Sequence, residues 1–150
     1  TMNVIVAMNN LLQQVIPNSV GRYTDEFYPT ATGDNFQKLG YNTVLIEAGH
    51  YPNDYEREIT RKYHFFGLLQ GVYHIAVNED FTTYETYFDI PNNVKNFYDV
   101  VHRYQDQPKN CVAYQYEEKI IENKLVFDLQ KVVKKELKNP LSHNEIVFDS

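Results

Sequence analysis

The chain contains a short apolar run, Thr43–Ile46 (TVLI), that favours one kind of secondary structure. Its residues are β-branched or apolar and do not alternate with polar ones, a pattern typical of a strand buried on both faces. Glu47 ends the run, and Gly49 then allows the chain to turn sharply. We therefore expect an inner strand of a sheet, with a carboxylate at its C-terminal end.

Apolar residues at helical spacing predict helices on both sides of this run. Residues 2–16 form the first, and because its periodicity begins at once, we expect further sequence upstream. A short helix over 35–39 ends at Gly40, a suitable C′ residue. The longest helix is expected over 54–76 with Asn53 as N-cap, and its broad apolar stripe indicates burial against a sheet.

The other segments give weaker signals. Residues 22–28 are rich in aromatic side chains and are expected to be a strand or extended. A helix is predicted over 93–104. Residues 112–116 and 125–129 alternate apolar with polar side chains around a turn near 122–124, which predicts a β-hairpin.

Composition excludes several classes of function. The net charge of −6, without a basic face, argues against nucleic acid as a partner. No apolar run approaches the ~20 residues that span a membrane. The single cysteine, Cys111, excludes an internal disulfide and every multi-cysteine metal site, and it lacks the basic setting of a nucleophile. A reducing, cytoplasmic compartment is the expectation that fits best.

Glu47 is the candidate catalytic residue. Ligands and reacting groups collect at the C-terminal ends of strands in α/β sheets. A carboxylate held there is partly removed from water, a setting that suits a general base. On position alone a second interpretation stays open, in which Glu47 caps a neighbouring loop or pairs with an arginine.

Residues 4–75 resemble the last third of the catalytic domain of zinc carboxypeptidases, particularly a bacterial branch. The most specific part is Leu45–Arg61 (LIEAGHYPNDYEREITR), and the order of helices, loop and strand is also similar. The resemblance implies an α/β fold, in which residues 1–77 are the C-terminal part of a mixed sheet flanked by helices. Residues 78–150 would then be an appendage made of a helix and a β-hairpin.

The resemblance also implies an activity. In that family the glutamate at the strand end promotes attack by zinc-bound water on a scissile amide, and Glu47 matches it. A tyrosine on a mobile loop closes over the substrate, and Tyr28, before the loop 29–33, is the nearest match. Tyr23 is the other candidate, and an edge tyrosine that only packs remains the alternative. The substrate would be a peptide or an N-acyl amino acid.

The zinc ligands of that family are missing from this chain. They comprise an H-x-x-E pair and a later histidine, and no histidine here has glutamate three residues on. The five histidines are His50, His64, His74, His102 and His143. We expect His50 to lie behind the metal ligands or to bond to the backbone rather than to bind a metal itself, and His143 to be solvated in a polar tail. Zinc would be held by the missing N-terminal part of the catalytic domain, which makes this chain inert alone.

A different class of function also fits. The chain would then be a non-catalytic interaction or oligomerisation domain, without metal. An apolar face of the helix 2–16 or of the strand 43–46 would be buried in a homo-oligomer or against another part of the protein.

Overall fold

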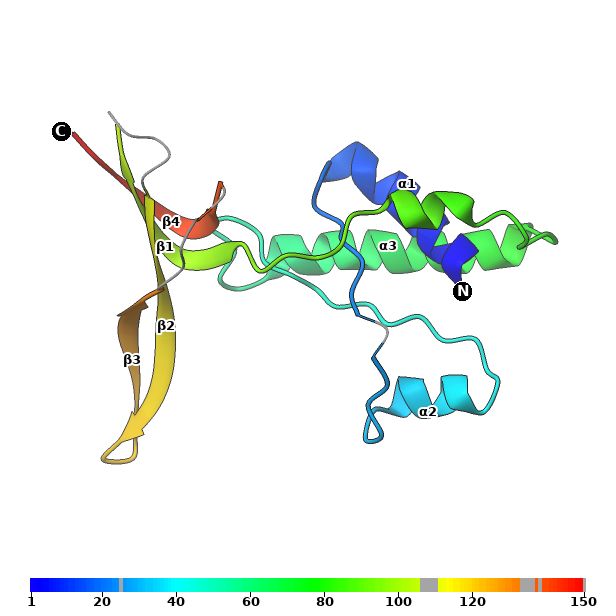
Figure 1. Cartoon of the computed structure of the whole chain (residues 1–150), viewed down its shortest axis with the longest axis horizontal. Helices are drawn as coiled ribbons and strands as arrows, with labels where there is room; N and C mark the ends of the chain where they lie inside the picture. The colour runs from blue at the N-terminus through cyan, green and yellow to red at the C-terminus, as the bar shows by residue number, and fades with distance from the viewer. Residues whose placement is uncertain (25, 106–110, 133–136, 138, 150) are drawn as a thin grey trace. The chain divides into compact units, whose positions relative to one another are not determined.

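The computed structural model describes residues 1–24, 26–105, 111–132, 137 and 139–149 (Figure 1). The elements are helices α1 (Met2–Val15), α2 (Thr32–Lys38) and α3 (Glu58–Val77), a 3-10 helix η1 (Glu85–Asp89), and strands β1 (Phe97–Tyr104), β2 (Cys111–Ile121), β3 (Lys124–Lys131) and β4 (Leu141–Phe148). This combination of helices with a mixed sheet confirms the predicted α/β class.

The chain divides into two compact units. Unit 1 comprises residues 1–49 and 60–94, and unit 2 comprises residues 50–59 and 95–150. All four strands belong to unit 2, and the isolated bridge Arg22–Asn92 is the strand-like pairing that the described residues of unit 1 form. The division into residues 1–77 and 78–150 stays a prediction.

Helices α1 and α3 pack together at two glycines of α3 (Figure 1). Gly67 and Gly71 are one helical turn apart and are the buried residues of α3. A Cβ atom added at Gly71 would lie 3.1 Å from the sulfur of Met8, and one at Gly67 would lie 3.4 Å from Cδ1 of Leu12. The predicted helix 2–16 is therefore confirmed, and its apolar stripe contacts α3.

The rest of α3 differs from the prediction. It begins at Glu58, because Asn53 has φ 57° and so cannot start a helix there, while the Asp54 carboxylate accepts the Ile59 amide N–H. Most of its large apolar side chains are exposed: Phe65, Leu68, Leu69, Val72, Tyr73, Ile75 and Val77. The prediction that this helix is largely buried is wrong, since unit 1 contains no sheet among its described residues to cover it.

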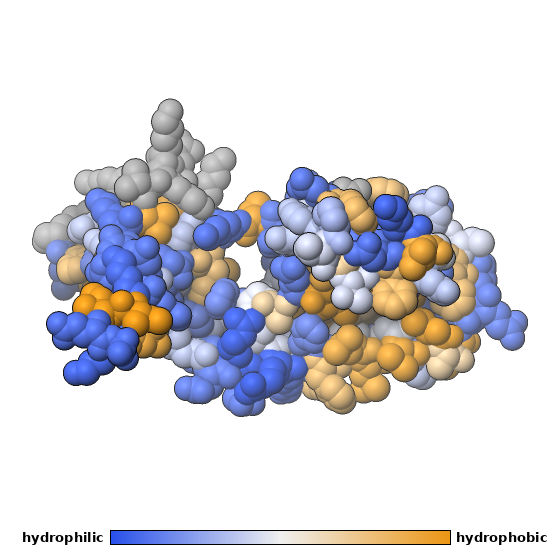
Figure 2. All heavy atoms as spheres, turned by 90° about the horizontal axis from the view of Figure 1, so that it is seen from below, coloured by the Kyte–Doolittle hydropathy of each residue, from blue (hydrophilic) through white to orange (hydrophobic). Residues whose placement is uncertain are grey.

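The predicted strand Thr43–Ile46 is also wrong. Residues 41–50 have no regular secondary structure, and Val44 and Leu45 are 37% and 66% exposed. A strand buried on both faces needs neighbouring strands and a layer on each side, and the described part of unit 1 supplies neither. Figure 2 shows the result as broad apolar areas on the surface of this unit.

Two smaller features of unit 1 follow local rules. Helix α2 ends as predicted at Gly40, whose φ is +91°, and the amides of Gly40 and Tyr41 donate to carbonyls of the last turn. In the segment 22–28, which is predicted to be a strand or extended, Arg22 forms a bridge with Asn92, and residue 25 lies outside the described residues. The Arg22 side chain donates to the carbonyl of Ile90 at 2.7 Å, which fixes the end of η1.

The sheet of unit 2 has the order β3-β2-β1-β4, with β1 and β4 parallel and the other pairs antiparallel. The predicted hairpin is confirmed as β2 and β3. Its turn places Glu122 and Asn123 at φ 49° and 60°, the left-handed values of a type I′ turn. Strand β1 lies where a helix was predicted over 93–104, because pairing with β2 and β4 decides its structure and buries Val100 and Val101.

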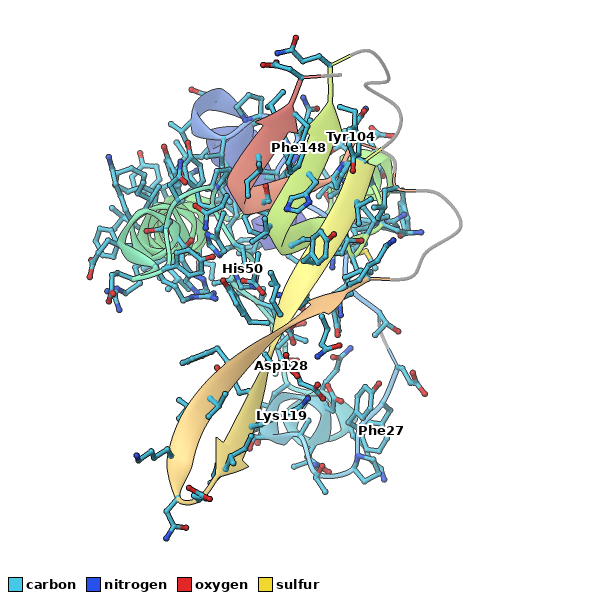
Figure 3. All side chains as sticks on the ribbon, turned by 90° about the vertical axis from the view of Figure 1, so that its left-hand side faces the viewer. Phe27, His50, Tyr104, Lys119, Asp128 and Phe148 are labelled. Carbon is cyan, nitrogen blue, oxygen red and sulfur yellow. The ribbon has the colours of Figure 1, made fainter. Side chains whose placement is uncertain are left out.

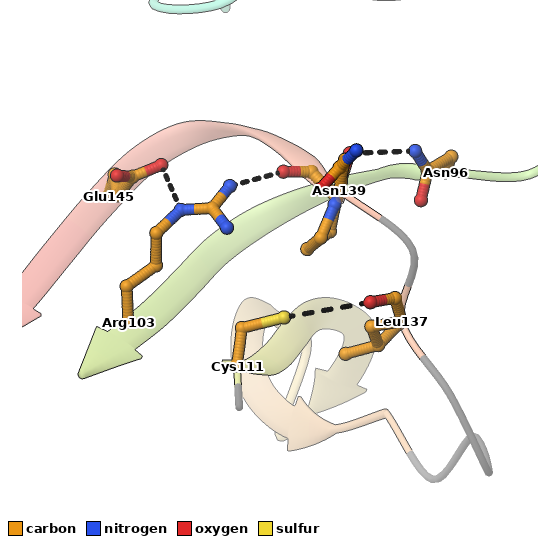
Figure 4. A network of polar contacts seen from close by, with 7 residues as sticks. Asn96, Arg103, Cys111, Leu137, Asn139 and Glu145 are labelled. Carbon is orange, nitrogen blue, oxygen red and sulfur yellow. Dashed lines mark hydrogen bonds and ion pairs between the residues drawn. The ribbon is translucent and has the colours of Figure 1, made fainter. Parts of the chain in front are cut away.

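Side-chain bonds fix β4 and the segment before it to β1 (Figure 4). The Arg103 guanidinium forms an ion pair with Glu145 at 2.8 Å and donates to the carbonyl of Pro140 at 2.7 Å. Asn96 donates to the carbonyl of Asn139 at 2.9 Å. These bonds hold the parallel strand in register on one side of β1.

Candidate functional site

The structure places the predicted catalytic carboxylate on the surface of unit 1. Glu47 is exposed and lies in the irregular segment 41–50. Tyr28 is 51% exposed, and its hydroxyl donates to Glu26 at 3.4 Å. Tyr23 is exposed as well. The predicted base and the predicted substrate tyrosine are therefore present but not assembled by the described residues.

A different group of side chains comes together in unit 2 (Figure 3 labels His50). The His143 ring stacks on Tyr55 at 4.0 Å between centroids and contacts Phe97 edge-on at 4.8 Å. His50 stacks on Phe97 at 5.2 Å and meets His143 edge-on at 5.5 Å. The segment that follows Gly49 is thus attached to the sheet through aromatic rings.

His143 is buried, contrary to the prediction that it is solvated. It is 5% exposed because β4 pairs with β1, which places this side chain beneath Tyr55. Its Nδ1 atom is buried and lacks a hydrogen-bond partner. An unpaired buried polar atom costs about 1–3 kcal/mol of folding stability. The folded chain is therefore less stable than it would be if Nδ1 of His143 had a hydrogen-bond partner.

The surroundings of His50 and Tyr55 favour the uncharged forms of these two side chains. Burial lowers the pKa of His50 below its ordinary value of 6.5, and Arg57 and His143 lower this pKa further, while Asp99 opposes them. Burial also raises the pKa of Tyr55, with a contribution from Asp99 in the same direction. A neutral His50 ring that packs on Phe97 is suited to holding the segment after Gly49 against the sheet.

The described residues do not assemble a zinc site among themselves. Catalytic zinc takes three protein ligands from His, Cys, Asp or Glu. Across the ranges that the structure describes, no three such side chains are grouped so that they could hold a metal ion. His50 and His143 come close to each other, but the contact between them is a packing contact of two rings.

A shallow hollow of about 430 Å³ lies beside His143 in unit 2. Its lining includes Arg103, but that guanidinium is already bound to Glu145 and to the carbonyl of Pro140. The hollow therefore offers no unengaged arginine to a charged ligand.

Comparison with known proteins leaves the family unassigned. The chain matches no protein-family model, no curated protein and no solved structure. In the part of the chain that the structure describes, no helix has the length and apolar character to cross a membrane.

Proposed function

We propose that this chain is the C-terminal part of a zinc carboxypeptidase-like hydrolase and supplies Glu47 as its general base. The sequence Leu45–Arg61 carries the proposal, because it joins an apolar run, a glutamate, a glycine and a long helix in the order seen in that family. The substrate is a peptide or an N-acyl amino acid. The zinc ligands belong to the missing N-terminal part of the same catalytic domain.

The exposure of the apolar run supports this proposal. Leu45 is 66% exposed and directly precedes Glu47, although leucine and valine side chains gain about 1.5–3 kcal/mol each when they are fully buried. Contacts with other parts of the full-length protein would bury these side chains. They would also hold Glu47 in one position, as a general base requires.

The exposed apolar side chains of α3 support the same conclusion. Phe65, Leu69 and Val72 are each more than half exposed on this helix. A helix that follows the strand in a larger α/β sheet would bury these side chains against it. The segment Thr43–Ile46 and helix α3 thus both expose apolar side chains that other parts of the full-length protein would bury.

The test uses the full-length protein in its zinc-loaded form. Glu47→Gln keeps the shape of the side chain and removes its ability to take a proton. We expect turnover of peptide or N-acyl amino acid substrates to fall about 10²–10⁴-fold, with the zinc content unchanged at about one per chain.

Glu79→Gln is the matched control, since Glu79 is also an exposed carboxylate of unit 1 outside the motif. This variant should keep full turnover. Unchanged turnover in zinc-loaded Glu47→Gln protein would refute the assignment of Glu47 as base.

The exposed apolar face of α3 also favours a second candidate function. A metal-free interaction domain would bury Leu69 and Val72 against a partner and need no catalytic carboxylate. The two candidates differ in what full-length protein contains. An upstream H-x-x-E sequence with bound zinc supports the hydrolase, whereas a folded oligomer without zinc supports the interaction domain.

A further inference from the structure

One face of the sheet in unit 2 carries a continuous row of aromatic rings. His102 contacts Tyr114 at 4.6 Å and Phe148 at 5.0 Å, and Tyr104 stacks on Phe148 at 5.6 Å. Figure 3 shows Tyr104 and Phe148 side by side on neighbouring strands. We call this side of the sheet, with the matching side of the hairpin, the aromatic face.

The aromatic face continues along the hairpin. Residues directly opposite in an antiparallel pair point to the same side, and the register opposes Tyr116 to Leu129, Glu118 to Phe127, and Ile120 to Leu125. A ring contact between Tyr116 and Phe127 at 6.3 Å confirms that these pairs share one side.

The other side of the hairpin has a different character. Lys119 forms ion pairs there with Asp128 at 2.7 Å and with Glu117 at 3.0 Å. Figure 3 shows Lys119 and Asp128 close together on this side. The hairpin therefore gathers most of its charged groups on this side, where Val126 and Ile121 also lie, and most of its large apolar side chains on the aromatic face.

The exposed apolar area of the aromatic face is large. Eight of its side chains are between 39% and 79% exposed: Tyr104, Tyr116, Ile120, Leu125, Phe127, Leu129, Ile146 and Phe148. Together they equal about four fully exposed side chains, or roughly 600 Å² at ~150 Å² each, the low end of the range for a large ring, because half of them are Leu or Ile. A stable protein interface covers about 800 Å² on each partner. The face alone approaches what a dimer needs.

The charges on this face are self-complementary. Its described residues carry one carboxylate, Glu118, and one ammonium group, Lys131, which lies opposite Tyr114 in the register. They stand on either side of the Tyr116–Leu129 pair, about 13 Å apart along the strands. Two copies related by a twofold axis at that pair would bring Glu118 of each copy to Lys131 of the other.

We propose that this chain forms a symmetric dimer through its aromatic face, with Glu118 of one copy paired to Lys131 of its partner. The partner is a second copy because the face has no net charge from these two groups, although the whole chain carries −6. Two such faces can meet without the repulsion that the remaining surface would impose. The proposal does not depend on the proposed activity.

A crosslinking experiment tests the predicted contact directly. A carbodiimide joins an amine and a carboxylate only when they touch, and Glu118 and Lys131 of one copy are too far apart to react. A 1:1 mixture of ¹⁴N- and ¹⁵N-labelled full chains is crosslinked and digested. We expect mixed-isotope peptides joining Glu118 to Lys131, and their absence would overturn the proposal.

Charge exchange gives a second, independent test by analytical ultracentrifugation. Glu118→Lys and Lys131→Glu should each weaken dimerisation roughly tenfold or more, because each places like charges together at two symmetric contacts. The double variant should restore it. Glu117→Lys is the matched control on the opposite side of the same strand, and circular dichroism checks that every variant is folded.

The same series contains the contradicting outcomes. A chain that stays monomeric, an open-ended assembly, or a dimer that ignores both charge reversals would overturn the proposal. A double variant that stays as weak as the single variants would do so as well, since only contact between two copies restores the pair.

Discussion

Two glycines on one face of α3 allow a sharp test of how α1 packs on it. Alanine favours an exposed helix by about 1 kcal/mol over glycine, so Gly→Ala stabilises wherever the new methyl group has room. At Gly67 the nearest atoms would be 3.4 Å and 3.5 Å from the new Cβ. At Gly71 it would meet the sulfur and Cγ of Met8 at 3.1 Å and 3.3 Å, and Cγ1 of Val4 at 3.4 Å.

The two substitutions should therefore have opposite signs. Overpacking of a tight contact costs about 1–3 kcal/mol, which exceeds the helix gain at Gly71, where the stiff Val4 side chain limits relaxation. We expect Gly71→Ala to lower the free energy of unfolding by about 1 kcal/mol and Gly67→Ala to raise it by about 0.5 kcal/mol.

Urea unfolding followed by circular dichroism measures both changes. Gly33→Ala, with nothing within 4 Å of the new atom, is the control for an uncrowded helix position. If Gly71→Ala stabilised the chain as much as Gly67→Ala, the close approach of α1 to α3 would be wrong.

Two further predictions concern unit 2. Because the pKa of His50 is lowered in the folded chain, the unfolded chain binds more protons as the pH falls below about 6.5, and the stability of the folded chain decreases there. Thermal unfolding between pH 7 and 5 should show a smaller loss of stability in His50→Phe than in wild type. An equal loss in both proteins would contradict the role of His50. Asn123 has φ 60° in the hairpin turn, so Asn123→Gly should keep or slightly raise the stability measured in urea, whereas Asn123→Val should lower it by about 1–2 kcal/mol. Equal midpoints for these two variants would exclude the type I′ turn.

The elements that the sequence predicted correctly are those that local chemistry decides. Helix α1 has its own apolar stripe, α2 ends at a glycine with positive φ, and the hairpin turn uses Asn123 in a left-handed conformation. Each depends on residues within a few positions along the chain. A single sequence is therefore enough to predict these local elements.

The wrong predictions concern residues whose structure depends on distant ones. The sequence pattern predicts a helix over 93–104, but β1 forms there because β2 and β4 pair with it on either side. His143 was expected in water and is buried for the same reason. The run Thr43–Ile46 has the composition of an inner strand, and no neighbouring strand among the described residues makes it one.

The candidate site shows the same limit. Sequence singled out Glu47 by its place after an apolar run, but a general base acts only beside the groups that bind and polarise its substrate. The described residues do not bring such groups to Glu47. The aromatic cluster of His50, Tyr55 and His143 escaped prediction because it joins a segment to a strand about 90 residues away along the chain.

The turnover of zinc-loaded full-length protein with Glu47→Gln decides whether Glu47 is the general base. We expect the variant to keep its zinc and to lose activity about 10²–10⁴-fold relative to wild type. Zinc retained together with wild-type turnover would contradict this assignment.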